Sequence, residues 1–274
     1  MDSYRNFIKN NENQMLSLLS ELISIPSVMG EATDTFPFGE KPAQALSVIL
    51  NAASQMGFTV TNRDNYYGTV DYLPDASSEP SLAVLCHLDV VPEGKGWTYP
   101  SFSLTEKDGM LYGRGVTDDK GPAVSVLFAL YAIKKLGVKL SKGVRLIFGT
   151  NEENGSADIK HYLRNKKMPS MVFTPDASYP VINCEKGMAR MNFSAKISNC
   201  DIISIHGGQV INAVPSDAEA IINSKYYDSA KAFIEDSNNG CVYSISERGD
   251  TVSIITKGES AHASTPENGI NAIT

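Results

Sequence analysis

Residues 81–89 read Ser-Leu-Ala-Val-Leu-Cys-His-Leu-Asp, a short apolar run followed directly by an imidazole and a carboxylate. Every residue from 82 to 86 is apolar, a pattern typical of a strand buried on both faces of a sheet. A second buried strand is predicted at 144–148, and an apolar helical pattern at 122–136 lies between the two. Buried strands that alternate with helices predict an α/β domain with a largely parallel sheet.

The same alternation extends through the first part of the chain. Apolar residues at helical spacing predict helices at 3–24, 42–56, 122–136 and 154–165. Short apolar or alternating runs predict strands at 58–62, 67–73, 82–86, 144–148 and 171–173. We therefore expect residues 1–183 to form a domain whose mixed, largely parallel sheet is flanked by helices.

The pattern changes after about residue 184. Alternating residues predict strands at 188–197, 218–222, 242–246 and 252–255, with one amphipathic helix near 226–236. This is typical of a smaller α+β domain with an antiparallel sheet. Pro266 precedes what we expect to be the start of a further helix, and the sequence ends within it. Since domains seldom end inside a helix, we expect 184–274 to be the first part of an incomplete domain.

The composition is that of a globular protein with a sizeable core. Apolar residues make up 42% of the 274 residues, charged residues 20%, and the net charge is −7. Scattered basic residues disfavour nucleic acid as a partner, and no apolar run approaches the roughly 18 residues that span a membrane. The polar N-terminus is unlike a signal peptide, so a cytoplasmic enzyme is predicted. The four cysteines lie far apart and indicate neither a disulfide framework nor a thiolate zinc site.

Acidic residues and one histidine follow the predicted strands at the points where these strands end. They are His87 and Asp89 after 82–86, Glu152 and Glu153 after 144–148, Asp176 after 171–173, and Asp118 and Asp119 in the glycine-rich turn before 122–136. Because the carboxyl ends of parallel strands line the ligand crevice of an open sheet, we expect these groups to converge on one edge.

One histidine with several carboxylates and no cysteine predicts a nitrogen and oxygen site that suits Zn²⁺ or Mn²⁺. Repulsion among the carboxylates favours two ions that share a bridging carboxylate. The Asp89 carboxylate can hold the second N–H of His87 and so select the tautomer that binds metal. The adjacent Glu152 and Glu153 indicate divided roles, one as a ligand and one as a general base for water.

Each feature also has an ordinary structural interpretation. Glu152 and Glu153 suit a helix N-terminus, where the helix dipole favours acidic residues. Asp118 and Asp119 suit an N-cap, and His87 alone suits a hydrogen-bonded core histidine. The joint placement of these residues at strand ends favours the metal site. Dinucleotide, Walker and nucleophile-elbow motifs are absent from the sequence.

Three histidines lie outside this group. His161 falls on a polar helix and is predicted to be solvated, and His206 is predicted to lie in a loop. His262 lies in a loop of small residues before a predicted helix, a place from which an imidazole can face a ligand.

Six segments resemble, in order, motifs of the co-catalytic zinc peptidases, the family of dipeptidase V, carnosinases, aminoacylases and succinyl-diaminopimelate desuccinylase. They are residues 81–92, 113–122, 151–156, 174–176, 211–215 and 258–272. The segment 36–39 and the variant Gly-Val-Thr-Asp-Asp-Lys-Gly-Pro at 115–122 make the resemblance closest to the dipeptidase V branch. The resemblance implies a zinc-exopeptidase-like catalytic domain with an inserted lid domain, of which 184–274 would be the first part.

Position by position, the resemblance implies two Zn²⁺ ions per full-length chain, with Mn²⁺ or Co²⁺ as alternatives. Asp118 would bridge both ions, His87 and Asp176 would complete one site, and Glu153 would bind the other ion. The spacing of the residues does not choose between Asp118 and Asp119; the family motif does. A cis peptide bond is expected between these two residues by similarity.

The resemblance also assigns roles around the ions. Glu152 would be the general base, and Asp89 would support His87. His262 would polarise the substrate carbonyl or stabilise the oxyanion, and Asn212 would contact the substrate backbone.

The implied activity is zinc-dependent hydrolysis of dipeptides or short peptides by a metal-activated water. An N-acyl-amino-acid amidohydrolase is the first alternative, and a truncated fragment that only binds metal is the second. The family's last histidine ligand and its lid arginine would lie beyond Thr274, which leaves the activity of this chain alone open. The implied partner is a small peptide, with neither nucleic acid nor membrane, and the protein would be a monomer or a homodimer.

Overall fold

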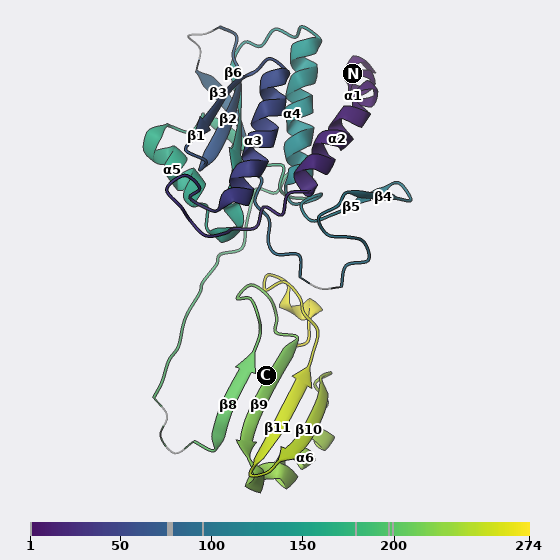
Figure 1. The fold of residues 1–274 in the computed structure, drawn as a ribbon, viewed down its shortest axis with the longest axis vertical. Coiled ribbons are helices and arrows are strands. Elements are labelled where there is room, and N and C mark those ends of the chain that lie inside the picture. Colours follow the sequence, from purple (N-terminus) through teal and green to yellow (C-terminus); the bar gives the residue numbers. More distant parts are fainter. Residues whose placement is uncertain (1, 76–78, 95, 179, 197, 199) are drawn as a thin grey trace. The chain divides into compact units, whose positions relative to one another are not determined.

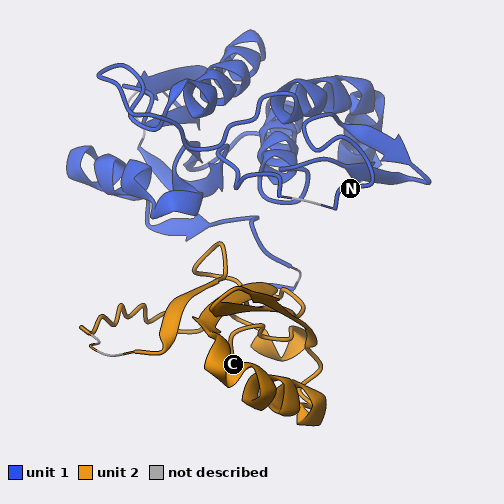
Figure 2. Cartoon of the chain, turned by 60° about the horizontal axis from the view of Figure 1, so that its bottom comes forward, with its two compact units in different colours: residues 1–182 blue, residues 183–274 orange. Residues whose placement is uncertain are grey.

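The computed structural model describes residues 2–75, 79–94, 96–178, 180–196, 198 and 200–274 (Figure 1). The chain divides into two compact units, residues 1–182 and residues 183–274 (Figure 2). Each unit contains a main sheet of its own, and the two sheets differ in the direction of their strands.

The main sheet of the first unit is mixed. It has five strands, in the order β1 (Thr59–Arg63), β2 (Tyr67–Tyr72), β6 (Gly143–Gly149), β3 (Pro80–His87) and β7 (Met171–Phe173). β3 runs parallel to β6 and β7, whereas β1, β2 and β6 pair antiparallel. The predicted mixed sheet is therefore confirmed, and its central strands are the two apolar runs that the sequence singled out.

Helices cover both faces of this sheet, because side chains of the central strands point alternately to opposite sides. Leu146 and Phe148 belong to the larger core, which packs under α2 (Glu12–Ile23), α3 (Glu40–Gln55) and α4 (Lys120–Lys135). Ile147 belongs to a smaller core with Tyr162 of α5 (Ala157–Asn165). A short hairpin of β4 (Thr105–Lys107) and β5 (Met110–Tyr112) completes the strands of this unit.

The first predicted helix consists of two helices. α1 (Asp2–Asn10) and α2 are separated at Asn11. Asn11 Nδ2 donates to the carbonyl oxygen of Phe7 over 2.7 Å, so this side chain competes with the backbone for hydrogen bonds. The prediction of one continuous helix at 3–24 is therefore wrong at this residue.

Other helix boundaries differ for reasons of local geometry. α3 and α4 begin two residues before the predicted starts, with Pro42 and Pro122 in the first turn, where an amide has no partner within the helix. The predicted helix at 154–165 is the 3₁₀ helix η1 (Glu152–Asn154) followed by α5, because Gly155 and Ser156 have φ of 98° and 53°. Among the described residues, no helix is both long enough and apolar enough to cross a membrane.

The second unit has an antiparallel sheet, as predicted. Its order is β10 (Val242–Arg248), β11 (Thr251–Lys257), β9 (Asp217–Asn223) and β8 (Ile202–Gly207), followed along the chain from β9 by η2 (Ser224–Tyr226) and α6 (Tyr227–Asp236).

Three predictions for the second unit are corrected. Residues 188–196 form no strand, although they alternate; an alternating pattern makes a strand only where a neighbour pairs its backbone groups, and Ile197 lies outside the described residues. His206 lies in β8 rather than in a loop. Pro266 begins only the short 3₁₀ helix η3 (Pro266–Asn268), because Gly269 leaves it in an extended conformation.

Candidate metal centre

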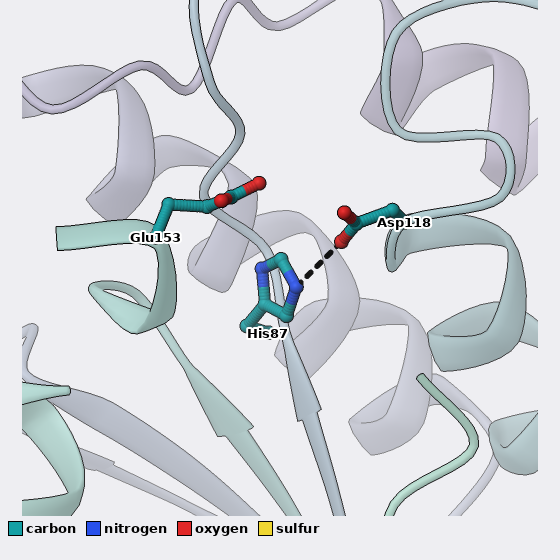
Figure 3. Close-up of side chains that lie close together, drawn as sticks. All are labelled: His87, Asp118 and Glu153. Carbon is teal, nitrogen blue, oxygen red and sulfur yellow. Dashed lines mark hydrogen bonds and ion pairs between the residues drawn. The ribbon is translucent and has the colours of Figure 1, made fainter. Parts of the chain in front are cut away.

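The candidate site lies where β3 and its neighbours end in the first unit. His87 is the last residue of β3 and is buried. The structure brings its ring nitrogens within 4.8 Å of ligand atoms in two overlapping groups, one with Asp118 and Glu153 and one with Asp119 and Asp176. Figure 3 shows His87, Asp118 and Glu153 facing one another from three separate segments. The predicted convergence at one edge of the sheet is thus what the structure shows.

The two nitrogens of His87 have different partners. Nδ1 lies 2.9 Å from the carbonyl oxygen of Asp89, so it carries a proton and donates it. Nε2 lies 2.8 Å from Asp118 Oδ1, the contact dashed in Figure 3, and 3.4 Å from Asp176 Oδ2. With Nδ1 occupied, Nε2 is the nitrogen that can bind a metal ion.

Asp89 contacts this site through its backbone and through its carboxylate, and the expectation that the carboxylate is the hydrogen-bond partner of His87 is corrected. Its backbone carbonyl is the near partner of His87, whereas its carboxylate Oδ1 lies 3.5 Å from Nδ1. The carboxylate instead accepts hydrogen bonds of 3.1 Å from the backbone N–H groups of Glu152 and Glu153. The fully buried Asp89 side chain therefore connects the His87 strand end to the turn that carries both glutamates.

The charges in the site shift the pKa values of its groups. Burial alone would lower the pKa of His87, but hydrogen bonds to Asp118, Asp176 and Asp89 together raise it above its ordinary value. The same contact with His87 lowers the pKa of Asp118. Burial, followed by the charge of Asp118, raises the pKa of Glu153 to about 7.

Glu152 lies beside the same charges. The protein displaces part of the water around this side chain, which raises its pKa, and nearby carboxylates, among them Asp176, add to the rise. A carboxyl group with a raised pKa is suited to accepting and returning a proton near neutral pH.

Asp119 is the member of the site that sequence reasoning set aside. It is fully buried, its Oδ2 accepts the backbone N–H of His87 over 2.9 Å, and its Oδ1 has no hydrogen-bond partner among the described residues. Burial raises the pKa of Asp119 to about 7. The Asp118–Asp119 peptide bond is cis, which confirms that expectation. In the sequence, only its position next to Asp118 indicated that Asp119 belongs to the site. The spacing of the residues could not decide which of the two is the metal ligand.

Asp158 was missed altogether. This fully buried carboxylate in α5 accepts the backbone N–H groups of Thr150 and Asn151 through Oδ2, over 2.7 and 2.9 Å. In the sequence it is an ordinary acidic residue in the first turn of a helix, and nothing marks it as part of the site.

The two remaining predicted site residues, Asn212 and His262, lie in the second unit. Ala213 and His262 form an isolated bridge, and Ala263 N–H donates to the carbonyl oxygen of Asn212 over 2.9 Å. His262 Nδ1 accepts from Ser264 N–H at 3.2 Å and lies 2.7 Å from the Ser264 hydroxyl. Nδ1 of this exposed imidazole is therefore unprotonated in its neutral form, and Nε2 carries the N–H.

The first unit is therefore an α/β domain with a mixed sheet. One imidazole and several carboxylates meet at the ends of its strands and form a candidate metal centre. Comparison with known sequences identifies the family of the chain. The chain belongs to peptidase family M20/M25/M40, whose profile matches residues 83–263. This membership confirms the resemblance carried by the six motifs.

Relatives agree with this assignment over nearly the whole chain. The Beta-Ala-Xaa dipeptidase of Lactobacillus delbrueckii subsp. lactis is 31% identical over 283 residues, covering 99% of this chain and 59% of that protein. YtjP of Bacillus subtilis (strain 168) is 36% identical over 264 residues, covering 92% of this chain and 56% of that protein. The chain thus spans somewhat more than half the length of these relatives.

Solved structures share the fold. Human carnosine dipeptidase 1 matches with a TM-score of 0.52 and 24% identity, over 59% of this chain and 37% of that chain. The dipeptidase Dug1p of Saccharomyces cerevisiae matches with a TM-score of 0.51 and 25% identity, over 60% of this chain and 37% of that chain.

Proposed function

We propose that the protein to which these residues belong hydrolyses the peptide bond of dipeptides or other short peptides, using two Zn²⁺ ions, which Mn²⁺ or Co²⁺ can replace. The observation that carries this proposal is the convergence of His87 with carboxylates at the strand ends, including a buried oxygen of Asp119 that lacks a partner among the described residues. Membership of a peptidase family and similarity to the Lactobacillus dipeptidase support the same activity.

The residues fit divalent cations. Six carboxylates surround a single imidazole: Asp89, Asp118, Asp119, Glu152, Glu153 and Asp176. Burial raises the pKa of Glu153 and of Asp119 to about 7, and the charges of neighbouring carboxylates add to the rise at both groups. Cations bound by nitrogen and oxygen would relieve the repulsion, and Zn²⁺ and Mn²⁺ accept such donors.

The proposed ligand set is the one that the family resemblance implies, and the two overlapping groups support its members His87, Asp118, Glu153 and Asp176. We assign Asp118 as the bridging ligand, because it faces His87 Nε2 at 2.8 Å and also groups with Glu153. His87 and Asp176 would hold one cation with it, and Glu153 would hold the other. Asp119 is the alternative ligand beside His87 and Asp176, because it groups with both and its Oδ1 has no hydrogen-bond partner among the described residues.

The chain's own groups supply the proton transfers. When bound, the cations would lower the pKa of a water molecule and polarise the peptide carbonyl. Glu152 would take the proton from the attacking water and deliver it to the leaving amine, so that one water and one peptide bond yield an acid and an amine. The hydrogen bond from its backbone N–H to Asp89 keeps Glu152 in place during both transfers.

The second unit would bind the substrate. We assign residues 1–183 as the catalytic domain and 184–274 as the first part of a lid domain. His262 presents an Nε2–H donor that can hydrogen bond to the substrate carbonyl oxygen as negative charge develops there. Asn212, on the segment beside His262, would contact the substrate backbone. The cytoplasmic location and the monomeric or dimeric state stay predictions.

The test uses the whole natural protein, with the 274-residue chain in parallel. We expect close to two metal ions per chain in the whole protein, and dipeptide hydrolysis that stops on chelation and returns with Zn²⁺. Hydrolysis of N-acetyl or N-succinyl amino acids but not of dipeptides would replace the proposal with an amidohydrolase. Absence of bound metal in the whole protein would refute it.

A further inference from the structure

We infer that Asp158 is a positioning residue for the Glu152–Glu153 pair, acting through the backbone of the turn that carries both glutamates. The inference rests on the function proposed above, because it gives those two side chains their importance. Asp158 belongs to neither candidate ligand group, so it can influence metal or substrate only through other residues.

Four consecutive backbone N–H groups in this turn donate to two buried carboxylates. Those of Thr150 and Asn151 donate to Asp158 Oδ2, over 2.7 and 2.9 Å. Those of Glu152 and Glu153 donate to Oδ1 and Oδ2 of Asp89, both over 3.1 Å. Asp158 and Asp89 have no exposed surface. The turn from β6 into η1 is therefore held at every amide by a carboxylate.

This arrangement determines where the glutamate side chains point. Residues 150–153 lie beyond the end of β6, so the sheet no longer supplies partners for their N–H groups. Buried N–H groups require acceptors, and hydrogen bonds to an ionised acceptor are roughly twice as strong as neutral ones. Because Asp158 holds the first half of the turn and Asp89 the second, the direction in which Glu152 and Glu153 leave the backbone is set by both.

The packing beside Asp158 supports a close and specific contact. A Cβ atom on Gly149, the last residue of β6, would overlap Asp158 Oδ2, so the strand ends in glycine where the carboxylate approaches. The other oxygen, Oδ1, accepts the N–H of Ile159 over 2.7 Å. The side chain of Asn151 connects the turn to the start of α5, since its Oδ1 accepts the N–H of Ala157 over 3.1 Å.

The first test is amide hydrogen exchange in the unmodified whole protein. We expect the amides of residues 150–153 to be protected like those of β6, although they lie outside any strand. Exchange as fast as that of exposed loops would overturn the inference without any variant having to fold.

The second test is Asp158→Asn in the whole protein. The amide group keeps the shape of the side chain but has a single acceptor oxygen, so its NH2 group faces either the N–H groups of the turn or that of Ile159, and at least one hydrogen bond is lost. We expect faster exchange at 150–153, a loss of roughly 10- to 100-fold in affinity for the ion assigned to Glu153, and a fall in kcat with little change in KM.

Asp71→Asn is the matched control, because it removes a largely buried carboxylate of the same unit that pairs with Arg145 away from the site. It should lower stability and leave affinity for Zn²⁺ unchanged. A folded D158N protein with unaltered Zn²⁺ affinity and kcat would overturn the inference alone. If the unmodified protein binds no Zn²⁺, the proposed function fails instead, whatever the exchange experiment shows.

Discussion

The imidazole of His87 is oriented by the backbone of Asp89. The carbonyl oxygen of Asp89 lies 2.9 Å from Nδ1 and can only accept, so that nitrogen carries a proton. Nε2 is thereby directed at Asp118, 2.8 Å away. The orienting partner is two residues along the chain, whereas the group that Nε2 faces comes from a distant turn. A metal ion would take the place of the Nε2 proton.

Replacing His87 with alanine should lower metal binding, because both candidate ligand groups share this residue. We expect H87A to hold at least one ion fewer than the unmodified protein in elemental analysis after dialysis against trace Zn²⁺. H161A is the matched control, since His161 stacks on Tyr66 with ring centroids 4.0 Å apart and belongs to neither group. Equal metal content in the two variants would contradict the ligand set.

Glu152→Gln should keep the bound metal and lose on the order of 10²- to 10⁴-fold in kcat, because an amide cannot accept the proton of the attacking water. Dipeptide hydrolysis by the whole protein, alongside elemental analysis, measures both quantities. The exposed Glu21 of α2 provides the control substitution Glu21→Gln. Full activity in E152Q would remove Glu152 from the role of general base.

Metal binding should release more protons at about pH 6 than at about pH 8. Burial raises the pKa of Glu153 and of Asp119 to about 7, so below this pH both carboxyl groups of the metal-free site hold protons. A cation near Glu153 favours the ionised forms and displaces these protons, so its affinity rises with pH up to about 7. Calorimetric titration in buffers of different ionisation enthalpy counts the protons. Equal release at both pH values would contradict the prediction.

Asp71→Asn should destabilise the first unit by about 3–5 kcal/mol, because it leaves a buried guanidinium without its charged partner. Asp71 accepts two hydrogen bonds of 2.7 Å from Arg145, whose side chain is 7% exposed. Urea denaturation measures the change. The exposed pair of Lys225 and Asp201 gives the comparison, since Asp201→Asn should have a much smaller effect. Similar losses in the two variants would show that burial of the Arg145 pair is unimportant.

Gly149→Ala should cost about 1–3 kcal/mol of stability, the usual range for overpacking in a core. The added Cβ would overlap Asp158 Oδ2 and push the carboxylate away from the turn. Gly187→Ala is the control, because a Cβ there meets nothing within 4 Å. Denaturant unfolding of both variants checks the difference, and a neutral Gly149→Ala would show that Asp158 has room to move.

Much of the first unit follows from local patterns. The apolar runs at 82–86 and 144–148 are β3 and β6. His87 directly after the first run and Glu153 in the turn after the second lie at one edge of the sheet. This is predictable because a run of consecutive apolar residues indicates a buried strand, and parallel strands end at the same edge of the sheet. Even the Nδ1 partner of His87 is only two residues away.

The pairing of strands in the second unit and the contacts of Asp119 and Asp158 depended on the tertiary structure. Alternation at 188–196 was present without a pairing strand, and β8 formed instead against β9. Asp119 joins the site because a turn far from His87 in the sequence brings a buried oxygen beside it. Asp158 is closer in the sequence, but it meets the Thr150 N–H only because Gly155 and Ser156 turn the chain between η1 and α5.

The sequence by itself therefore determined the family, the α/β sheet and the set of acidic groups at its edge, since these follow from motifs and from periodicity along a short stretch of chain. Only the tertiary structure decided which carboxylate faces Nε2 of His87 and which ones hold the backbone of Glu152 and Glu153. Hydrogen bonds require atoms within about 3 Å, and for residues far apart in the sequence that closeness arises only when the chain packs.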